Sequence, residues 1–80
     1  MNFTAYITVG LKEGMLDPEA NTILKALNNQ GFDVKSLKAG RRFTVVFDAP
    51  TKDDAYAMAE AMCIDFLANP VIQRYDIEVL

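Results

Sequence analysis

The chain has 80 residues, of which 51% are hydrophobic and 24% are charged, a composition typical of a folded globular domain. We therefore expect one domain over residues 1–80. The net charge is −3, and among the basic residues only Arg41 and Arg42 are adjacent, which argues against a nucleic-acid partner because phosphate neutralisation needs a clustered basic surface. A chain this short buries only about 60 to 65% of the surface that its unfolded form exposes, so self-association is expected to supplement a thin core.

Several classes of function are excluded by what the sequence lacks. It contains no histidine and a single cysteine, Cys63, so it cannot form a Ser-His or Cys-His nucleophile or a zinc or iron–sulfur site with several His or Cys ligands. Gly10 and Gly14 do not have the spacing of a dinucleotide loop or a P-loop. No apolar run approaches the roughly 20 residues of a membrane span. We expect no catalytic residue, metal or cofactor on this chain, no membrane partner and a cytoplasmic location.

The first half of the chain predicts a strand and a helix, followed by a weaker strand. Apolar residues at every second position from Phe3 to Val9 are typical of a strand with one buried face. Asp17 followed by Pro18 predicts a helix start, and the helix should run to about Gln30 with Gly31 as its stop. Asp33–Ala39 is expected to be a weak edge strand, which Gly40 turns into the next strand.

The second half predicts a strand, a helix and a last strand. Arg41–Asp48 alternates like the first strand, with Phe43, Val45 and Phe47 on its buried side. Thr51 and Asp54 resemble a capping box ahead of a helix from Lys52 to about Ala68. Asn69-Pro70 ends this helix, and Val71–Leu80 returns to alternation. The core stripe of the helix is expected to consist of Ala55, Met58, Ala59, Met62 and Phe66, with Cys63 as a small buried hydrophobe beside it.

The order of elements is therefore βαββαβ. This order predicts an α+β fold of two layers, in which two helices pack on one face of a mostly antiparallel four-stranded sheet in a ferredoxin-like arrangement.

Two stretches of the sequence resemble a known family. Leu11 to Ala20, which reads Leu-Lys-Glu-Gly-Met-Leu-Asp-Pro-Glu-Ala, followed by Gly31-Phe32, is similar to the N-terminal half of PurS proteins. Phe66 to Ile72, which reads Phe-Leu-Ala-Asn-Pro-Val-Ile, is similar to their C-terminal half. PurS proteins are small subunits of the phosphoribosylformylglycinamidine (FGAM) synthase complex. The resemblance covers nearly the whole chain, and its motifs are structural rather than catalytic.

The resemblance implies a non-catalytic adaptor in an ATP-dependent carbon–nitrogen ligase of purine biosynthesis. In that family the glutaminase PurQ releases ammonia from glutamine, and PurL binds ATP with Mg together with the ribonucleotide. The implied partners are PurL, PurQ and further copies of the chain, as a dimer or a dimer of dimers. A segment-swapped dimer is a further hypothesis, in which the last helix and strand are exchanged about the Asp48–Thr51 link.

Candidate partner contacts lie in two connections and at one turn. Lys12, Glu13 and Gly14 form a loop after a strand, where partner contacts are often placed, although a solvated connection explains them equally well. Asn69 and Pro70 either present a docking surface or only stop the helix. Arg41 follows Gly40 where the family usually has lysine. The alternative function is a regulatory ferredoxin-like dimer that binds a small ligand between its subunits.

Overall fold

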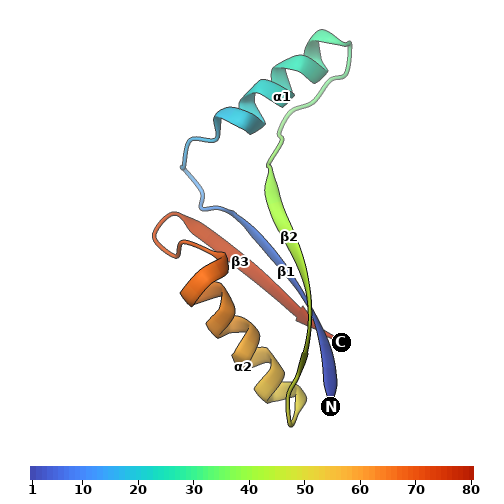
Figure 1. Ribbon diagram of the computed structural model, residues 1–80. Helices are drawn as coiled ribbons and strands as arrows, with labels where there is room; N and C mark the ends of the chain where they lie inside the picture. The colour runs from blue at the N-terminus through green and yellow to red at the C-terminus, as the bar shows by residue number, and fades with distance from the viewer.

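Three antiparallel strands form the body of the protein in the computed structural model, which describes residues 1–80 (Figure 1). The strands are β1 (Asn2–Leu11), β2 (Gly40–Asp48) and β3 (Gln73–Val79), arranged in the order β2-β1-β3. The helices are α1 (Pro18–Asn29) and α2 (Lys52–Met62), and a π-helical turn, η1 (Cys63–Leu67), directly follows α2. Neither helix is long and apolar enough to cross a membrane.

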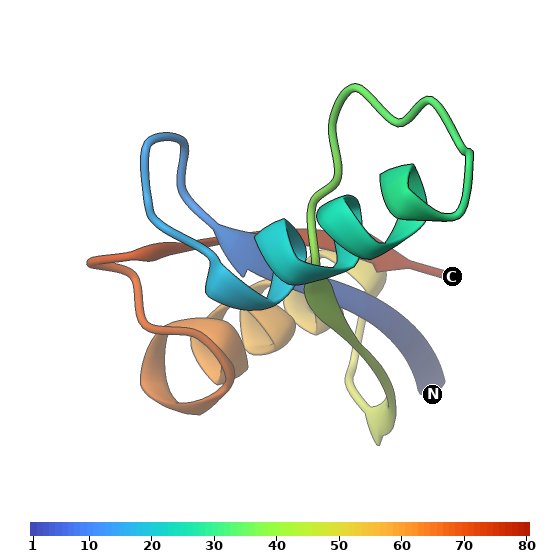
Figure 2. The same ribbon diagram turned by 90° about the horizontal axis from the view of Figure 1, so that it is seen from above.

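The core lies between the sheet and α2. Phe3, Ala5, Ile7 and Val9 of β1 are buried, as the alternation of the sequence predicts. Figure 2 shows α2 on one side of the strands, where it packs against β1 and β3. The residues of α2 and η1 that meet the sheet most closely are small, and each is 0% exposed, so the helix can approach the strands closely. They are Ala55, Ala59 and Cys63.

The expected core stripe of the second helix is partly wrong. Met58 is 39% exposed and Phe66 is 90% exposed. The amide of Ala68 donates a hydrogen bond to the carbonyl oxygen of Cys63 at 2.9 Å, a spacing of five residues that widens the last turn. This wider turn changes the direction in which Phe66 points, and its side chain faces solvent.

The expected strand over Asp33–Ala39 is also wrong, and with it the count of four strands. Gly40 does not turn the chain but is the first residue of β2, where it pairs with Gly10. A Cβ atom at Gly40 would lie 2.7 Å from the carbonyl oxygen of Val9. The glycine therefore allows a close approach to β1, and residues 33–39 run on beyond the sheet instead of folding back beside β2.

Helix α1 lies beyond the end of the sheet and not on the face that α2 covers (Figure 1). The predicted caps form: the side chain of Asp17 accepts a hydrogen bond from the amide of Ala20 at 3.1 Å, and Gly31 has φ +98°. The returning segment is held to α1 by Asn28, whose side chain bonds to both backbone groups of Val34. We call residues 18–39 the arm.

The arm makes the single chain elongated. The radius of gyration is 16.0 Å, against about 12 Å for a compact domain of this length. The last helix and strand pack on β1 of their own chain, so the part that stands apart from the sheet is the arm, and not the segment after the Asp48–Thr51 link.

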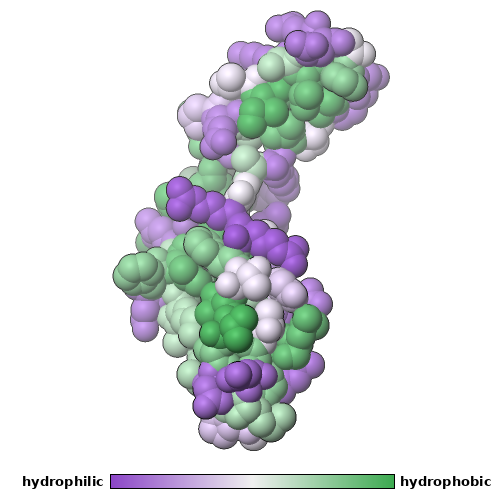
Figure 3. Space-filling model, turned by 45° about the vertical axis from the view of Figure 1, so that its right-hand side comes forward, coloured by the Kyte–Doolittle hydropathy of each residue, from purple (hydrophilic) through white to green (hydrophobic).

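Two apolar surfaces consequently lack a cover within the chain. Phe43, Val45 and Phe47 of β2 are only half-buried beside α2; we call them the open sheet area. On the arm, Ile23 is 39% exposed and Phe32 is 60% exposed. Figure 3 shows apolar side chains along one side of the arm and again on the body, separated by a hydrophilic band.

Candidate functional site

Two turns meet at the end of the sheet from which the arm projects. The amide of Lys12, directly after β1, donates a hydrogen bond to the carbonyl oxygen of Ile72, directly before β3, at 2.9 Å. The same end contains the start of β2, because Gly10 pairs with both Gly40 and Arg74. We call this end, with residues 12–17, 37–41 and 69–74, the hinge end. The two chain termini lie at the opposite end of the body (Figure 1).

The structure brings the six candidate contact residues to this one end. Lys12, Glu13 and Gly14 form a turn in which Gly14 has φ +82°, a conformation that favours glycine. Arg41 lies opposite Val9 in the β1–β2 ladder. It therefore points to the face of the sheet that α2 covers. Asn69 and Pro70 lie in the turn that the bond to Lys12 anchors.

Asn69 organises its turn through both its side chain and its backbone. Its side-chain oxygen accepts a hydrogen bond from the amide of Val71 at 3.1 Å, and its own amide donates to the side-chain oxygen of Gln73 at 2.8 Å. Its carbonyl oxygen accepts from the amides of Ile72 and Gln73. With Pro70 fixing one backbone angle, this network holds an exposed turn in a single shape.

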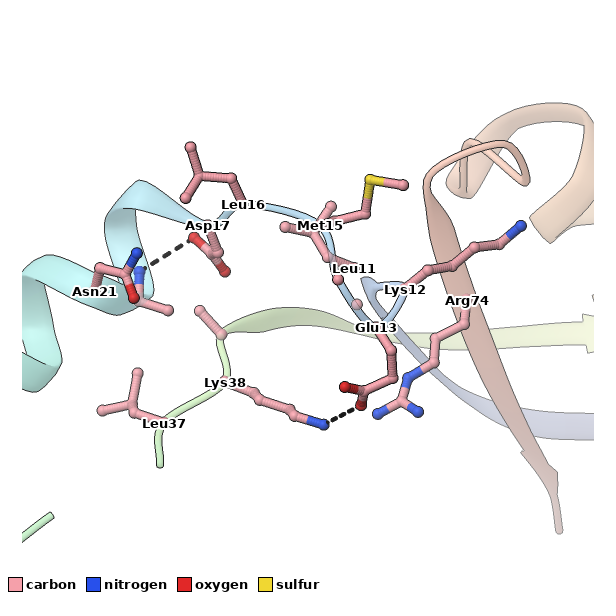
Figure 4. Close-up of a pocket in the computed structure, with 14 residues that line it drawn as sticks. Leu11, Lys12, Glu13, Met15, Leu16, Asp17, Asn21, Leu37, Lys38 and Arg74 are labelled. Carbon is pink, nitrogen blue, oxygen red and sulfur yellow. Dashed lines mark hydrogen bonds and ion pairs between the residues drawn. The ribbon is translucent and has the colours of Figure 1, made fainter. Parts of the chain in front are cut away.

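A hollow of about 220 Å³ lies at the base of the arm (Figure 4). Across it, the ammonium of Lys38 lies 2.6 Å from the carboxylate of Glu13. Hydrogen bonding to Lys38 lowers the pKa of Glu13 below its ordinary value, and the charges of Lys38 and Arg74 act in the same direction. Figure 4 shows Arg74 near this pair, while the side chain of Lys12 extends toward the turn before β3.

The hinge end exposes charged and apolar side chains, whereas the thiol of the one cysteine is buried elsewhere in the chain. No group of three or more His, Cys, Asp or Glu side chains is placed to hold a metal ion. Cys63 is 0% exposed, and burial, with a smaller effect from Glu60, raises the pKa of its thiol, so the reactive thiolate is disfavoured. The hinge end exposes cations, apolar side chains and two turns that backbone hydrogen bonds hold in place.

The sequence did not reveal three residues of the hinge end and its surroundings. Phe66 was expected in the core. Val71 was expected to begin a strand beside the candidate Asn69-Pro70 turn, and it lies in the turn itself. Lys38 and Arg74 stood out only as charges in expected strands. Their approach to Glu13 depends on the pairing of β1 with β3 and on the path of residues 33–39, which no local pattern contains.

Comparison with known proteins places this arrangement in a family. Residues 4–80 match the model of the family PurS, described as phosphoribosylformylglycinamidine (FGAM) synthase. The chain belongs to the PurS family. The resemblance found in the two sequence stretches is therefore confirmed.

PurS relatives agree with this chain over nearly their whole length. Phosphoribosylformylglycinamidine synthase subunit PurS of Archaeoglobus fulgidus is 40% identical over 74 residues, covering 91% of this chain and 92% of the relative. The subunit of the same name from Methanocaldococcus jannaschii is 36% identical over 78 residues, covering 96% and 94%. A chain in the structure of PurLQS from Thermotoga maritima superposes with a TM-score of 0.93 at 30% identity, covering 100% of this chain and 99% of that one. The elongated shape with its projecting arm is therefore shared with this solved chain.

Proposed function

We propose that this chain is the PurS subunit of an FGAM synthase, in which it serves as a non-catalytic adaptor. The observation that carries the proposal is the full-length match to a chain of PurLQS, at a TM-score of 0.93. The lack of a His-based nucleophile or a metal-binding cluster fits a subunit that carries no chemistry of its own.

The adaptor would act by holding two active sites together. A glutaminase, PurQ, releases ammonia, and a synthetase, PurL, uses it with ATP and Mg to convert formylglycinamide ribonucleotide to formylglycinamidine ribonucleotide. Free ammonia would escape into water or be protonated, so the two sites must be close and shielded. In this proposal ATP and Mg bind to PurL in the cytoplasm, and this chain binds neither.

A second copy of the chain is the first partner. The apolar side of the arm and the open sheet area belong to one chain but lie too far apart to cover each other. The arm of one copy would cover the open sheet area of the other copy, beside its α2. The arm of the second copy would cover the open sheet area of the first in the same way. The exchanged element would then be the arm.

The catalytic subunits would meet the hinge end. Lys12, Glu13, Gly14, Asn69 and Pro70 are exposed there, and the bond between Lys12 and Ile72 joins their two turns into one surface. Arg41 would extend this surface along β2. A rigid, pre-shaped turn loses little entropy when it binds, which suits a docking element.

The test is reconstitution with PurL and PurQ from the same organism. Glutamine-dependent formation of formylglycinamidine ribonucleotide is expected only when this chain is present, while ammonia-driven formation by PurL changes little. Equal glutamine-dependent activity without the chain would overturn the proposal. Titrating the isolated chain with glutamine, ADP and ribonucleotide tests the alternative of a ligand-binding regulator, which predicts saturable binding without PurL or PurQ.

A further inference from the structure

The arm is held together by contacts of its own. Asp17 caps the start of α1, and the side chain of Asn28 bonds to both backbone groups of Val34 in the segment that returns from the helix. The elements that pack on each other are β1 with β2 and β3, and α2 with β1, β3 and η1, whereas α1 packs closely on no strand. We therefore expect the arm to move as one piece relative to the body.

Two short connections join the arm to the body. Residues 12–17 lead into α1, residues 37–39 lead from the arm into β2, and neither connection contains a helix or a strand. Hinges form in such connections, because a few backbone angles can absorb a change of direction. The backbone alone therefore does not fix the angle between the arm and the body.

One side-chain contact links the two connections. The ammonium of Lys38, in the second connection, lies 2.6 Å from the carboxylate of Glu13, in the first. No other hydrogen bond or ion pair joins residues 12–17 to residues 37–39. The pair spans the hollow at the base of the arm (Figure 4), so breaking it would leave the two connections free to move apart.

Glu13 also lies close to a third segment of the chain. Figure 4 shows the guanidinium of Arg74, from β3, near the Glu13–Lys38 pair. The pKa of Glu13 is lowered first by its hydrogen bond to Lys38 and, to a smaller extent, by the charge of Arg74. The other charged side chains of the hollow do not compete for this carboxylate, because Lys12 extends toward the turn before β3 and Asp17 caps α1. Glu13 therefore lies beside cations from both the arm and the sheet.

We propose that Glu13 is a positioning residue, which fixes the angle of the arm by holding Lys38 of the arm close to Arg74 of β3. The inference rests on the proposed exchange of arms between two copies and adds the contact that prepares each arm for it. An arm held at one angle loses less conformational entropy on meeting the open sheet area of a second copy than a freely moving arm does. The exposed pair is weak in each chain, but two such pairs act in one dimer.

The test measures self-association of the full chain by light scattering over a series of concentrations. Glu13→Gln and Lys38→Gln should each weaken it by about two- to tenfold, and the double variant should weaken it no further, because both changes break the same pair. The difference from the wild type should disappear in about 1 M salt, which screens exposed charges. Lys35→Gln is the matched control, because it breaks a similarly exposed pair with Asp33 inside the arm.

A second measurement reads the angle of the arm directly. Spin labels on Asn29→Cys in the arm and Thr44→Cys in β2, both at exposed positions, report the distance between arm and body by pulsed EPR. The labelled chain also carries Cys63→Ala, which removes the native thiol, and Ile23→Lys, which keeps a second copy from holding the arm. Loss of the ion pair should broaden the distribution of distances, and the control should leave it unchanged.

The outcomes separate this inference from the exchange of arms. If the wild-type chain does not self-associate, the exchange fails, and the distance distribution alone decides whether Glu13 positions the arm. If Glu13→Gln associates as tightly as Lys35→Gln, the exchange stands and the inference is wrong. If association weakens but the distribution stays narrow, Glu13 and Lys38 contact the second copy directly, which also overturns the inference. Weaker association together with a broader distribution supports it, and reconstitution with PurL and PurQ tests the adaptor role separately.

Discussion

Gly40 and Val9 touch through their backbones at the point where the arm leaves the sheet. A Cβ atom on Gly40 would lie 2.7 Å from the carbonyl oxygen of Val9 and 3.6 Å from its carbonyl carbon. Gly10, which pairs with Gly40 across the ladder, has nothing within 4 Å of the same position. A side chain would therefore fit at position 10, whereas one at position 40 would clash with the backbone of β1.

Gly40→Ala is expected to lower the free energy of unfolding by about 1 to 3 kcal/mol, because the new methyl group forces two backbones apart. Gly10→Ala should change the same quantity by no more than about 0.5 kcal/mol, because it enters open space. Urea unfolding of the two variants beside the wild type measures both values. Equal losses would show that the close approach at Gly40 is not what selects glycine there.

Cys63→Ser is expected to destabilise the protein more than Cys63→Ala does. Cys63 is 0% exposed among apolar residues, so a hydroxyl there loses its hydrogen bonds to water, at a cost of about 1 to 3 kcal/mol. Alanine leaves only a small cavity. Urea unfolding of both variants distinguishes the two effects, and a serine variant as stable as the alanine one would mean that the hydroxyl finds a partner.

Glu13 is expected to titrate below its ordinary pKa of about 4.3, because Lys38 donates a hydrogen bond to its carboxylate. A lowered pKa in the folded state means that the pair stabilises the fold above about pH 4.3 and that this contribution is lost as the pH falls. Carbon NMR of the side-chain carboxyl measures the midpoint. Lys38→Gln should raise it, whereas Lys35→Gln, which breaks a pair with Asp33 inside the arm, should leave it unchanged.

Ile23→Lys is expected to weaken self-association, because it places a charge on the apolar side of the arm. Asn29→Lys introduces the same charge at an exposed position on the polar side of the same helix and should not weaken it. Light scattering after size exclusion, over a series of micromolar concentrations, measures the effect. If both variants keep the wild-type mass, the arm is not the contact between copies.

The strands and the helix starts could be predicted because their causes are local. The alternation from Phe3 to Val9 and the cap at Asp17 are complete within a few residues, and both were confirmed. The path of residues 33–39 was not predictable in this way. Glycine at position 40 is equally suited to a turn and to a close approach, and the choice depends on Val9, 31 positions earlier.

The candidate site was predicted as two separate loops, and the structure joins them. Each loop was found from its own residues, around Lys12 and around Asn69. Their bond to each other follows from the antiparallel pairing of β1 with β3. The outward position of Phe66 had no signal in the sequence, because a change from α-helical to π-helical hydrogen bonding leaves the spacing of apolar residues unchanged.

The distance between the arm and the open sheet area also bears on how the stability of this protein should be reported. If each chain completes its core only with the arm of another, folding and association are linked by mass action. The thermal midpoint would then rise with protein concentration, and dilution alone would favour unfolding. A melting temperature for this chain therefore has meaning only together with the protein concentration at which it is measured.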